Sequence, residues 1–177
     1  MKTFKNSPLT PLFGKERGFT FVELILYVGI VAVIISAIIP LSWAVIEGAA
    51  ESGVQQEIWS SARFISEKIK WEIRNSSGIN SVTANSISLG NFLPADNPTV
   101  ITFTYPNVTV KKGAAAAVRI NPDGVRVGIL VFTDFSSGDG KSKQIQYYLK
   151  VESGGTSLRQ EYQQSLIIDS SAEVRSL

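Results

Sequence analysis

Apolar residues are concentrated in one long run near the N-terminus of the chain. Residues 19–46 contain a single charged side chain, Glu23, and the 23 residues from Leu24 to Ile46 contain none. About 20 consecutive apolar residues are enough for an α-helix to cross the hydrocarbon core of a bilayer. A core helix of a soluble protein rarely stays apolar on every face over so many turns. The run therefore predicts a single transmembrane helix.

Beyond this run the pattern changes to that of an amphipathic helix. Lys68 and Glu72 are spaced to form an i,i+4 ion pair, which we place on the polar side, and Gly78 suits a left-handed helix cap. A continuous helix from Phe19 to Asn75, 57 residues long, would measure about 85 Å at 1.5 Å per residue. Five apolar residues recur every three or four positions and define the buried face: Ile58, Ala62, Ile65, Ile69 and Ile73.

After residue 77, short stretches of alternating residues separated by turn residues indicate β-strands. Pro122-Asp123-Gly124 is expected to form a hairpin turn between two of them. An antiparallel sheet with one apolar face, packed on the amphipathic half of the helix, accounts for the pattern and gives an α+β fold. The predicted strands are Ser86–Leu89, Val100–Tyr105, Val108–Lys111, Val118–Asn121, Val125–Thr133, Gln144–Val151, Leu158–Tyr162 and Leu166–Asp169.

Composition removes several kinds of chemistry. The chain has neither cysteine nor histidine, which excludes disulfides, thiolate zinc sites, a Cys nucleophile and a Ser-His-Asp arrangement. Serine and aspartate are plentiful, but no sequence context pairs a nucleophile with a base. We therefore predict a protein that is not an enzyme and needs no cofactor.

The charges on the two sides of the apolar run differ in sign. Residues 1–18 hold four basic residues and one acidic residue, whereas Glu47, Glu51 and Glu57 follow the run. By the positive-inside rule the N-terminus lies in the cytoplasm and the C-terminal domain is extracytoplasmic. Removing residues 1–18 from the 17 basic and 15 acidic residues leaves 13 and 14. This near-neutral exported part argues against nucleic-acid binding, because such binding normally requires a basic surface.

Glu23 stands at the start of the apolar run, where a carboxylate usually has a partner or lies at headgroup depth. Residues 15–24, KERGFTFVEL, resemble the prepilin signature of type IV pilins and type II secretion pseudopilins. That signature is a short basic leader ending in Gly, an aromatic or aliphatic first mature residue, and Glu at the fifth mature position. Gly18, Phe19 and Glu23 match it, with Lys15 and Arg17 as leader basic residues, and the resemblance extends over about residues 14–46.

This resemblance implies cleavage between Gly18 and Phe19 by a membrane-embedded prepilin peptidase, which also methylates the new Phe19 amine. In family filaments the carboxylate equivalent to Glu23 pairs with the amine of a neighbouring subunit. Pro40 is the twenty-second mature residue, where family filaments contain a locally melted stretch. The resemblance also implies a pilin fold, a cytoplasmic-membrane precursor and a mature form in a pilus or pseudopilus. The partners it implies are other pilin or pseudopilin subunits, the prepilin peptidase, an inner-membrane assembly platform and the membrane.

Four segments follow from these patterns: a prepilin leader (1–18), a transmembrane and filament-core helix (19–46), its amphipathic continuation (47–76) and an exported β-rich domain (77–177). Among subtypes, the long helix followed by a Tyr-Tyr-Leu strand and a Leu-Arg-Gln-Glu-Tyr strand resembles J-type minor pseudopilins and related minor pilins. A major pilin remains open.

Two alternatives and one metal site remain open at this point. The chain is alternatively a single-pass membrane-anchored binding protein, or a DNA-uptake pilin with a local basic stripe made of Arg126, Lys111, Lys112, Lys141 and Lys143. Asp134, Ser136 and Asp139 offer oxygen ligands for Ca²⁺, although their spacing is not that of an EF-hand and Lys141 is adverse. A plain hairpin loop is the favoured interpretation of that segment.

Overall fold

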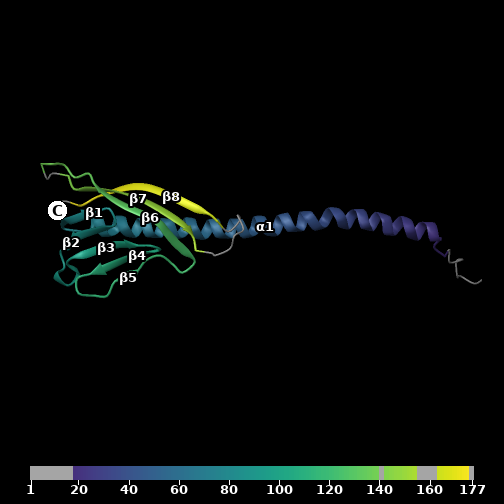
Figure 1. Ribbon diagram of the computed structural model, residues 1–177, viewed down its shortest axis with the longest axis horizontal. Helices are drawn as coiled ribbons and strands as arrows, with labels where there is room; N and C mark the ends of the chain where they lie inside the picture. The colour runs from purple at the N-terminus through teal and green to yellow at the C-terminus, as the bar shows by residue number, and fades with distance from the viewer. Residues whose placement is uncertain (1–17, 140–141, 155–162, 176–177) are drawn as a thin grey trace, which may run out of the picture. The chain divides into compact units, whose positions relative to one another are not determined.

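The computed structural model of the chain describes residues 18–139, 142–154 and 163–175, which fall into two compact units divided between Ala44 and Val45. Helix α1 (Phe21–Arg74) supplies the first unit and the start of the second, and every strand belongs to the second (Figure 1). One long N-terminal apolar helix followed by antiparallel sheets is an α+β arrangement, as the sequence predicted. It is consistent with the pilin fold.

Every residue of α1 from Leu24 to Ile46 is exposed; this stretch covers the first unit up to Ala44 and the first two residues of the second. This part of the helix is long and apolar enough to cross a membrane, and none of its most apolar window is buried. Side chains that are apolar on all faces and pack on nothing in their own chain need an apolar solvent or a partner. The predicted helix limits were slightly wrong: α1 begins at Phe21 instead of Phe19 and ends at Arg74 instead of Asn75.

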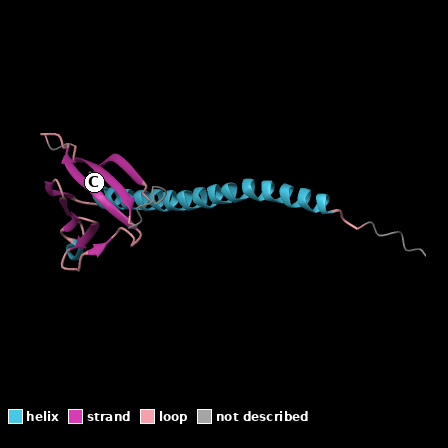
Figure 2. Ribbon diagram, turned by 45° about the vertical axis from the view of Figure 1, so that its right-hand side comes forward, coloured by secondary structure: helices cyan, strands magenta, loops and turns pink. Residues whose placement is uncertain are grey.

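The second unit contains two antiparallel sheets (Figure 2). In the five-stranded sheet the spatial order follows the chain, and a short 3₁₀ helix, η1 (Pro94–Asp96), lies between β2 and β3. Its strands are β1 (Gly78–Thr83), β2 (Ser86–Gly90), β3 (Thr99–Thr104), β4 (Asn107–Lys112) and β5 (Val118–Arg119). The three-stranded sheet consists of β6 (Val125–Asp134), β7 (Gln144–Ser153) and β8 (Ser165–Glu173).

The two sheets meet along the outer edge of β6. The N–H of Val127 donates to the carbonyl of Pro106, and the N–H of Phe132 donates to the carbonyl of Ala84, both at 2.9 Å. These carbonyls lie in the turns between β3 and β4 and between β1 and β2, so hairpin ends of one sheet satisfy the edge of the other. An edge strand otherwise exposes unpaired backbone groups.

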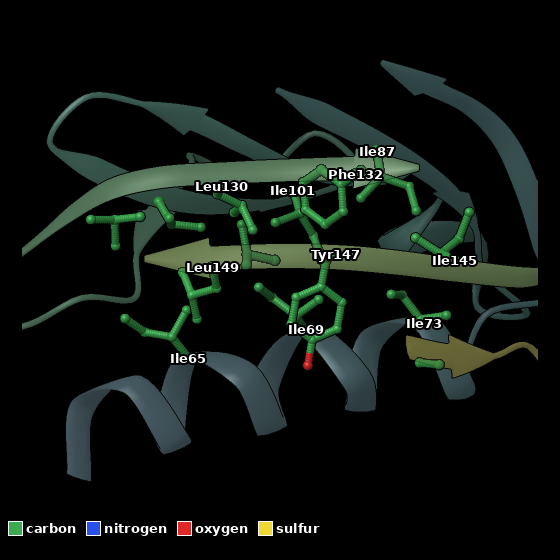
Figure 3. Packing of buried hydrophobic residues seen from close by; sticks show 14 of the residues in the cluster. Ile65, Ile69, Ile73, Ile87, Ile101, Leu130, Phe132, Ile145, Tyr147 and Leu149 are labelled. Atoms are coloured by element: carbon green, nitrogen blue, oxygen red, sulfur yellow. The ribbon is translucent and has the colours of Figure 1, made fainter. Parts of the chain in front are cut away.

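The core lies between the C-terminal part of α1 and the two sheets (Figure 3). All five residues of the predicted helical stripe are buried: Ile58, Ala62, Ile65, Ile69 and Ile73. The strand predicted from alternating residues over Gln144–Val151 is also confirmed as part of β7, because every second residue is buried: Ile145, Tyr147, Leu149 and Val151. Periods of 3.6 and 2 residues thus fix which face each element turns to the core.

Tyr147 makes the polar contact at the centre of this core. Its hydroxyl lies 2.7 Å from Ser66 Oγ and also donates to the Ser66 carbonyl at 3.3 Å. Both residues are buried. The contact joins β7 to α1 and satisfies two polar side chains that would otherwise be costly to bury.

Replacing Tyr147 with phenylalanine should destabilise the second unit by about 1–2 kcal/mol, because it leaves the buried Ser66 hydroxyl without its phenol partner. Urea unfolding of the full chain in detergent, followed by tryptophan fluorescence, measures the change. Tyr148→Phe is the matched control, since Tyr148 is 37% exposed on the other face of β7 and its loss should stay within about 0.5 kcal/mol. Equal effects of the two variants would contradict the prediction.

Several strand predictions were wrong in detail. One sheet was expected, and two form. The hairpin at Pro122-Asp123-Gly124 does not form, because β5 pairs with β4 while β6 pairs with β7. The sequence prediction missed β1, whose residues are mostly exposed or half-buried and which depends on pairing with β2. Leu158–Tyr162 lies outside the described residues.

The prediction for Glu72 was also wrong, because it does not lie on a solvated polar face. Its side chain is 3% exposed, and its carboxylate oxygens lie 2.9 Å from Lys68 Nζ and 3.3 Å from Lys112 Nζ. Both ammonium groups also lie over the Trp71 ring, at 4.6 and 5.0 Å from its centroid. Lys112 comes from β4, so the sheet supplies the second cation that a helical pattern could not reveal.

Candidate functional site at the start of helix α1

Thr20 sets the first residue of α1. Its side-chain Oγ1 accepts a hydrogen bond from the N–H of Glu23 at 3.2 Å, and its carbonyl accepts the first helical bond, from Leu24 N–H, at 3.1 Å. A threonine that accepts a bond from the third helical residue is an N-cap. The preceding residues, Gly18 and Phe19, are consequently not helical.

Gly18 and Phe19 are both exposed in this irregular segment. The Phe19 ring meets the Tyr27 ring edge-on, with centroids 5.8 Å apart and planes at 67°. A Cβ built on Gly18 would find nothing within 4 Å. The described chain therefore has no steric need for glycine at position 18.

Glu23 lies in the first turn of α1 and is half-buried. A carboxylate there interacts favourably with the positive end of the helix dipole. Within residues 18–139, 142–154 and 163–175, no cation or hydrogen-bond donor contacts its carboxylate oxygens. The leader basic residues Lys15 and Arg17 lie outside the described residues.

Pro40 lies inside α1, and the helix continues through it without a break. Proline has no N–H, so the carbonyl four residues earlier, that of Ser36, loses its helical donor. Two serine hydroxyls near this gap bond to helix carbonyls, Ser36 to Val33 at 2.7 Å and Ser42 to Ile38 at 3.0 Å. The prepilin resemblance implies that the helix is locally melted around Pro40 in filaments. For this chain that remains a prediction.

The two carboxylates among the candidate calcium ligands accept local hydrogen bonds, whereas the Ser136 hydroxyl has no hydrogen-bond partner within the described residues. Asp134 Oδ1 accepts from the Ser136 N–H at 2.8 Å, and the Ser137 hydroxyl donates to Asp139. The Ser136 side chain beside Asp134 and the hydrogen bond from the Ser136 N–H hold the pKa of the Asp134 carboxyl below its usual range. Across the part of the chain that the structure describes, no three or more His, Cys, Asp or Glu side chains form a group that could hold a metal ion.

The basic stripe of the DNA-uptake alternative is partly used within the fold. Lys112 contacts Glu72 and also lies 3.8 Å from Asp96, and Arg126 donates to the Gly154 carbonyl at 2.7 Å. Lys141 lies outside the described residues. Two of the five predicted cations are therefore occupied by acidic or carbonyl groups of the same domain.

Sequence reasoning missed the role of Thr20. The signal was present, because Thr20-Phe21-Val22-Glu23 has the S/T-x-x-E spacing of a capping box directly ahead of an apolar run. The prepilin resemblance concerns Gly18, Phe19 and Glu23 and assigns no role to Thr20.

Comparison with known proteins adds no relative to this description. No protein-family model matches the chain, and neither a curated protein nor a solved structure is significantly similar to it.

Proposed function

We propose that this chain is a structural subunit of a type IV pilus or type II secretion pseudopilus, processed and N-methylated by a prepilin peptidase and assembled through α1. The observation that carries the proposal is the order of features at one helix start. An exposed Gly18–Phe19 bond precedes the helix, Glu23 lies in its first turn, and the uncharged exposed run from Leu24 to Ile46 follows.

Gly18 supports cleavage at the predicted bond. The described residues leave open space where a side chain would stand, so packing among them does not explain the glycine. An enzyme with a narrow cleft does, because glycine lets a protein backbone approach closely. The bond after Gly18 lies in exposed irregular backbone, which is where proteases cut.

The uncovered surface of α1 supports assembly through the helix. Before assembly a bilayer would cover residues 24–46, and afterwards other subunits would cover them. Gly29 also supports packing against another helix. Glycine destabilises a helix by about 0.5–1 kcal/mol relative to alanine, so its presence inside α1 calls for a compensating contact. Apart from the neighbouring residues and backbone of its own helix, no described atom lies within 4 Å of a Cβ built there. Small residues allow helices to approach closely where apolar solvent gives no hydrophobic driving force.

Glu23 supports a defined register between subunits. Its carboxylate would pair with the methylated Phe19 amine of a neighbouring subunit. In a low-dielectric filament core, a carboxylate without its partner is strongly unfavourable. Registers that leave Glu23 unpaired are thereby disfavoured.

The proposed precursor is a single-pass inner-membrane protein with a cytoplasmic N-terminus and an extracytoplasmic β-rich domain. Its proposed partners are the prepilin peptidase, an inner-membrane assembly platform and other subunits, and its role is assembly instead of catalysis. We favour the minor, J-like subtype on the pattern of β7, with adjacent Tyr147, Tyr148 and Leu149.

The mature N-terminus tests the proposal. Mass spectrometry of the full chain, expressed with an active or an inactive prepilin peptidase, should find N-methylated Phe19 only with the active enzyme. Gly18→Leu is the control variant and should remain uncut, because its side chain obstructs the cleft without disturbing the fold. Retention of Met1 with the active peptidase, or a cut beyond Ile46, would overturn the proposal and favour the membrane-anchored binding protein.

A further inference from the structure

The start of α1 lies close to the bond that we propose is cut. Only Phe19 and Thr20 separate the Gly18 carbonyl from the first helical residue, Phe21. Inside a helix, the carbonyl of a peptide bond accepts a hydrogen bond from the N–H four residues later. A protease that binds its substrate in an extended conformation must therefore unfold that turn first. The position of the helix start therefore decides whether the bond is available.

We infer that Thr20 and Tyr27 are positioning residues for this cleavage, which keep the Gly18–Phe19 bond outside the helix. The inference rests on the proposed function. In the step, water oxygen bonds to the Gly18 carbonyl carbon, the C–N bond breaks, and Phe19 nitrogen takes a proton, which leaves a Gly18 carboxylate and a Phe19 amine. Thr20 and Tyr27 act on the conformation of the bond and take no part in the chemistry.

Thr20 acts through its cap. Its hydroxyl and carbonyl oxygens accept the N–H groups of Glu23 and Leu24, which favours a helix that starts at Phe21 over one that starts upstream. The upstream residues would otherwise permit extension, since Lys15, Glu16 and Arg17 are all good helix formers. Gly18 opposes extension by about 1 kcal/mol. Without the cap, the helix should therefore extend upstream and include the Gly18–Phe19 peptide bond.

Tyr27 acts through its ring. Phe19 precedes the N-cap, and its edge-on contact with Tyr27, at 5.8 Å, ties this residue to the second turn of the helix. A contact of this kind, between the residue before the cap and the helix, fixes the angle at which the chain enters. With the Phe19 side chain held, the chain direction through Gly18 is restricted before the peptidase binds.

The test is cleavage of the full chain in detergent by a purified prepilin peptidase, with kcat and KM measured separately. Thr20→Val keeps the shape of the side chain and loses the acceptor, and we expect kcat/KM to fall about fivefold, the size of a typical cap. Thr20→Ser keeps the acceptor and should cleave at the wild-type rate. Tyr27→Leu should lower the rate, and Tyr27→Phe, which keeps the ring, should not.

Hydrogen exchange of the Phe21 and Val22 amides distinguishes a shift of the helix start from general destabilisation, because general destabilisation would not protect these two amides. With the helix starting at Phe21, the Phe21 and Val22 amides precede the first helical bonds and should exchange fast. In Thr20→Val they should become protected, because an upstream start gives them acceptors.

The inference is overturned by wild-type cleavage of Thr20→Val, by equal slowing of Thr20→Ser, or by slower cleavage without new protection at Phe21 and Val22. A wild-type chain that is not cut after Gly18 would instead overturn the proposed function itself. The two failures are therefore distinguishable.

Discussion

Replacing Glu23 with leucine should strongly reduce incorporation of this subunit into filaments, while membrane insertion and leader cleavage proceed normally. The carboxylate contacts no cation among the described residues, so the single chain loses no ion pair with it. Leucine at a membrane-helix start also makes insertion more favourable. In a filament, however, the substitution would leave the methylated Phe19 amine of each neighbour buried without its counter-ion, and removing one partner of such a pair costs about 3–5 kcal/mol.

We expect incorporation of Glu23→Leu into filaments to fall by more than about tenfold, measured by sedimentation of sheared filaments and mass spectrometry of the subunit. Glu23→Gln is the matched control for shape, because it keeps the volume and loses the charge, and it should fail as well. Glu23→Asp should retain part of the assembly. Normal incorporation of Glu23→Leu would contradict a role for the carboxylate in register.

Removing both lysines around Glu72 should destabilise the second unit strongly, by about 3–5 kcal/mol, because it leaves a buried carboxylate uncompensated. Lys68 and Lys112 are the cations that contact Glu72 in the described residues, and the Glu72 side chain is 3% exposed. Glu72→Met removes the charge together with its need for partners, and it should change the free energy of unfolding by less than about 1 kcal/mol. Urea unfolding of the full chain in detergent compares Lys68→Met/Lys112→Met with Glu72→Met.

Trp71 provides the control for this experiment. The two lysines also lie over its ring, so the double variant loses cation–π contacts as well as ion pairs. Trp71→Leu removes those contacts alone and should cost about 1–2 kcal/mol, since each contact at a partly exposed site contributes about 0.5–1 kcal/mol. If Glu72→Met were as destabilising as the double lysine variant, the penalty would not come from an uncompensated charge.

The candidate site could be predicted from the sequence because its features are local. Its three motif residues, Gly18, Phe19 and Glu23, lie within six residues of each other. The apolar run after them can be recognised as a candidate membrane helix from composition alone. The cap at Thr20 was equally local and was missed, because the resemblance concerned its neighbours. The Phe19–Tyr27 contact could not be found from the motif, since it depends on where the helix begins.

The sequence by itself determined the long N-terminal helix, its change from an apolar to an amphipathic half, and the buried faces of α1 and β7. Those follow from a periodicity of 3.6 or 2 residues, which acts within one element. Only the tertiary structure decided that two sheets form, that β6 pairs with β7 instead of β5, and that Glu72 is buried between cations from α1 and β4. Strand pairing and charge burial depend on residues far apart in the chain, and the same local pattern permits several partners until the whole core has packed.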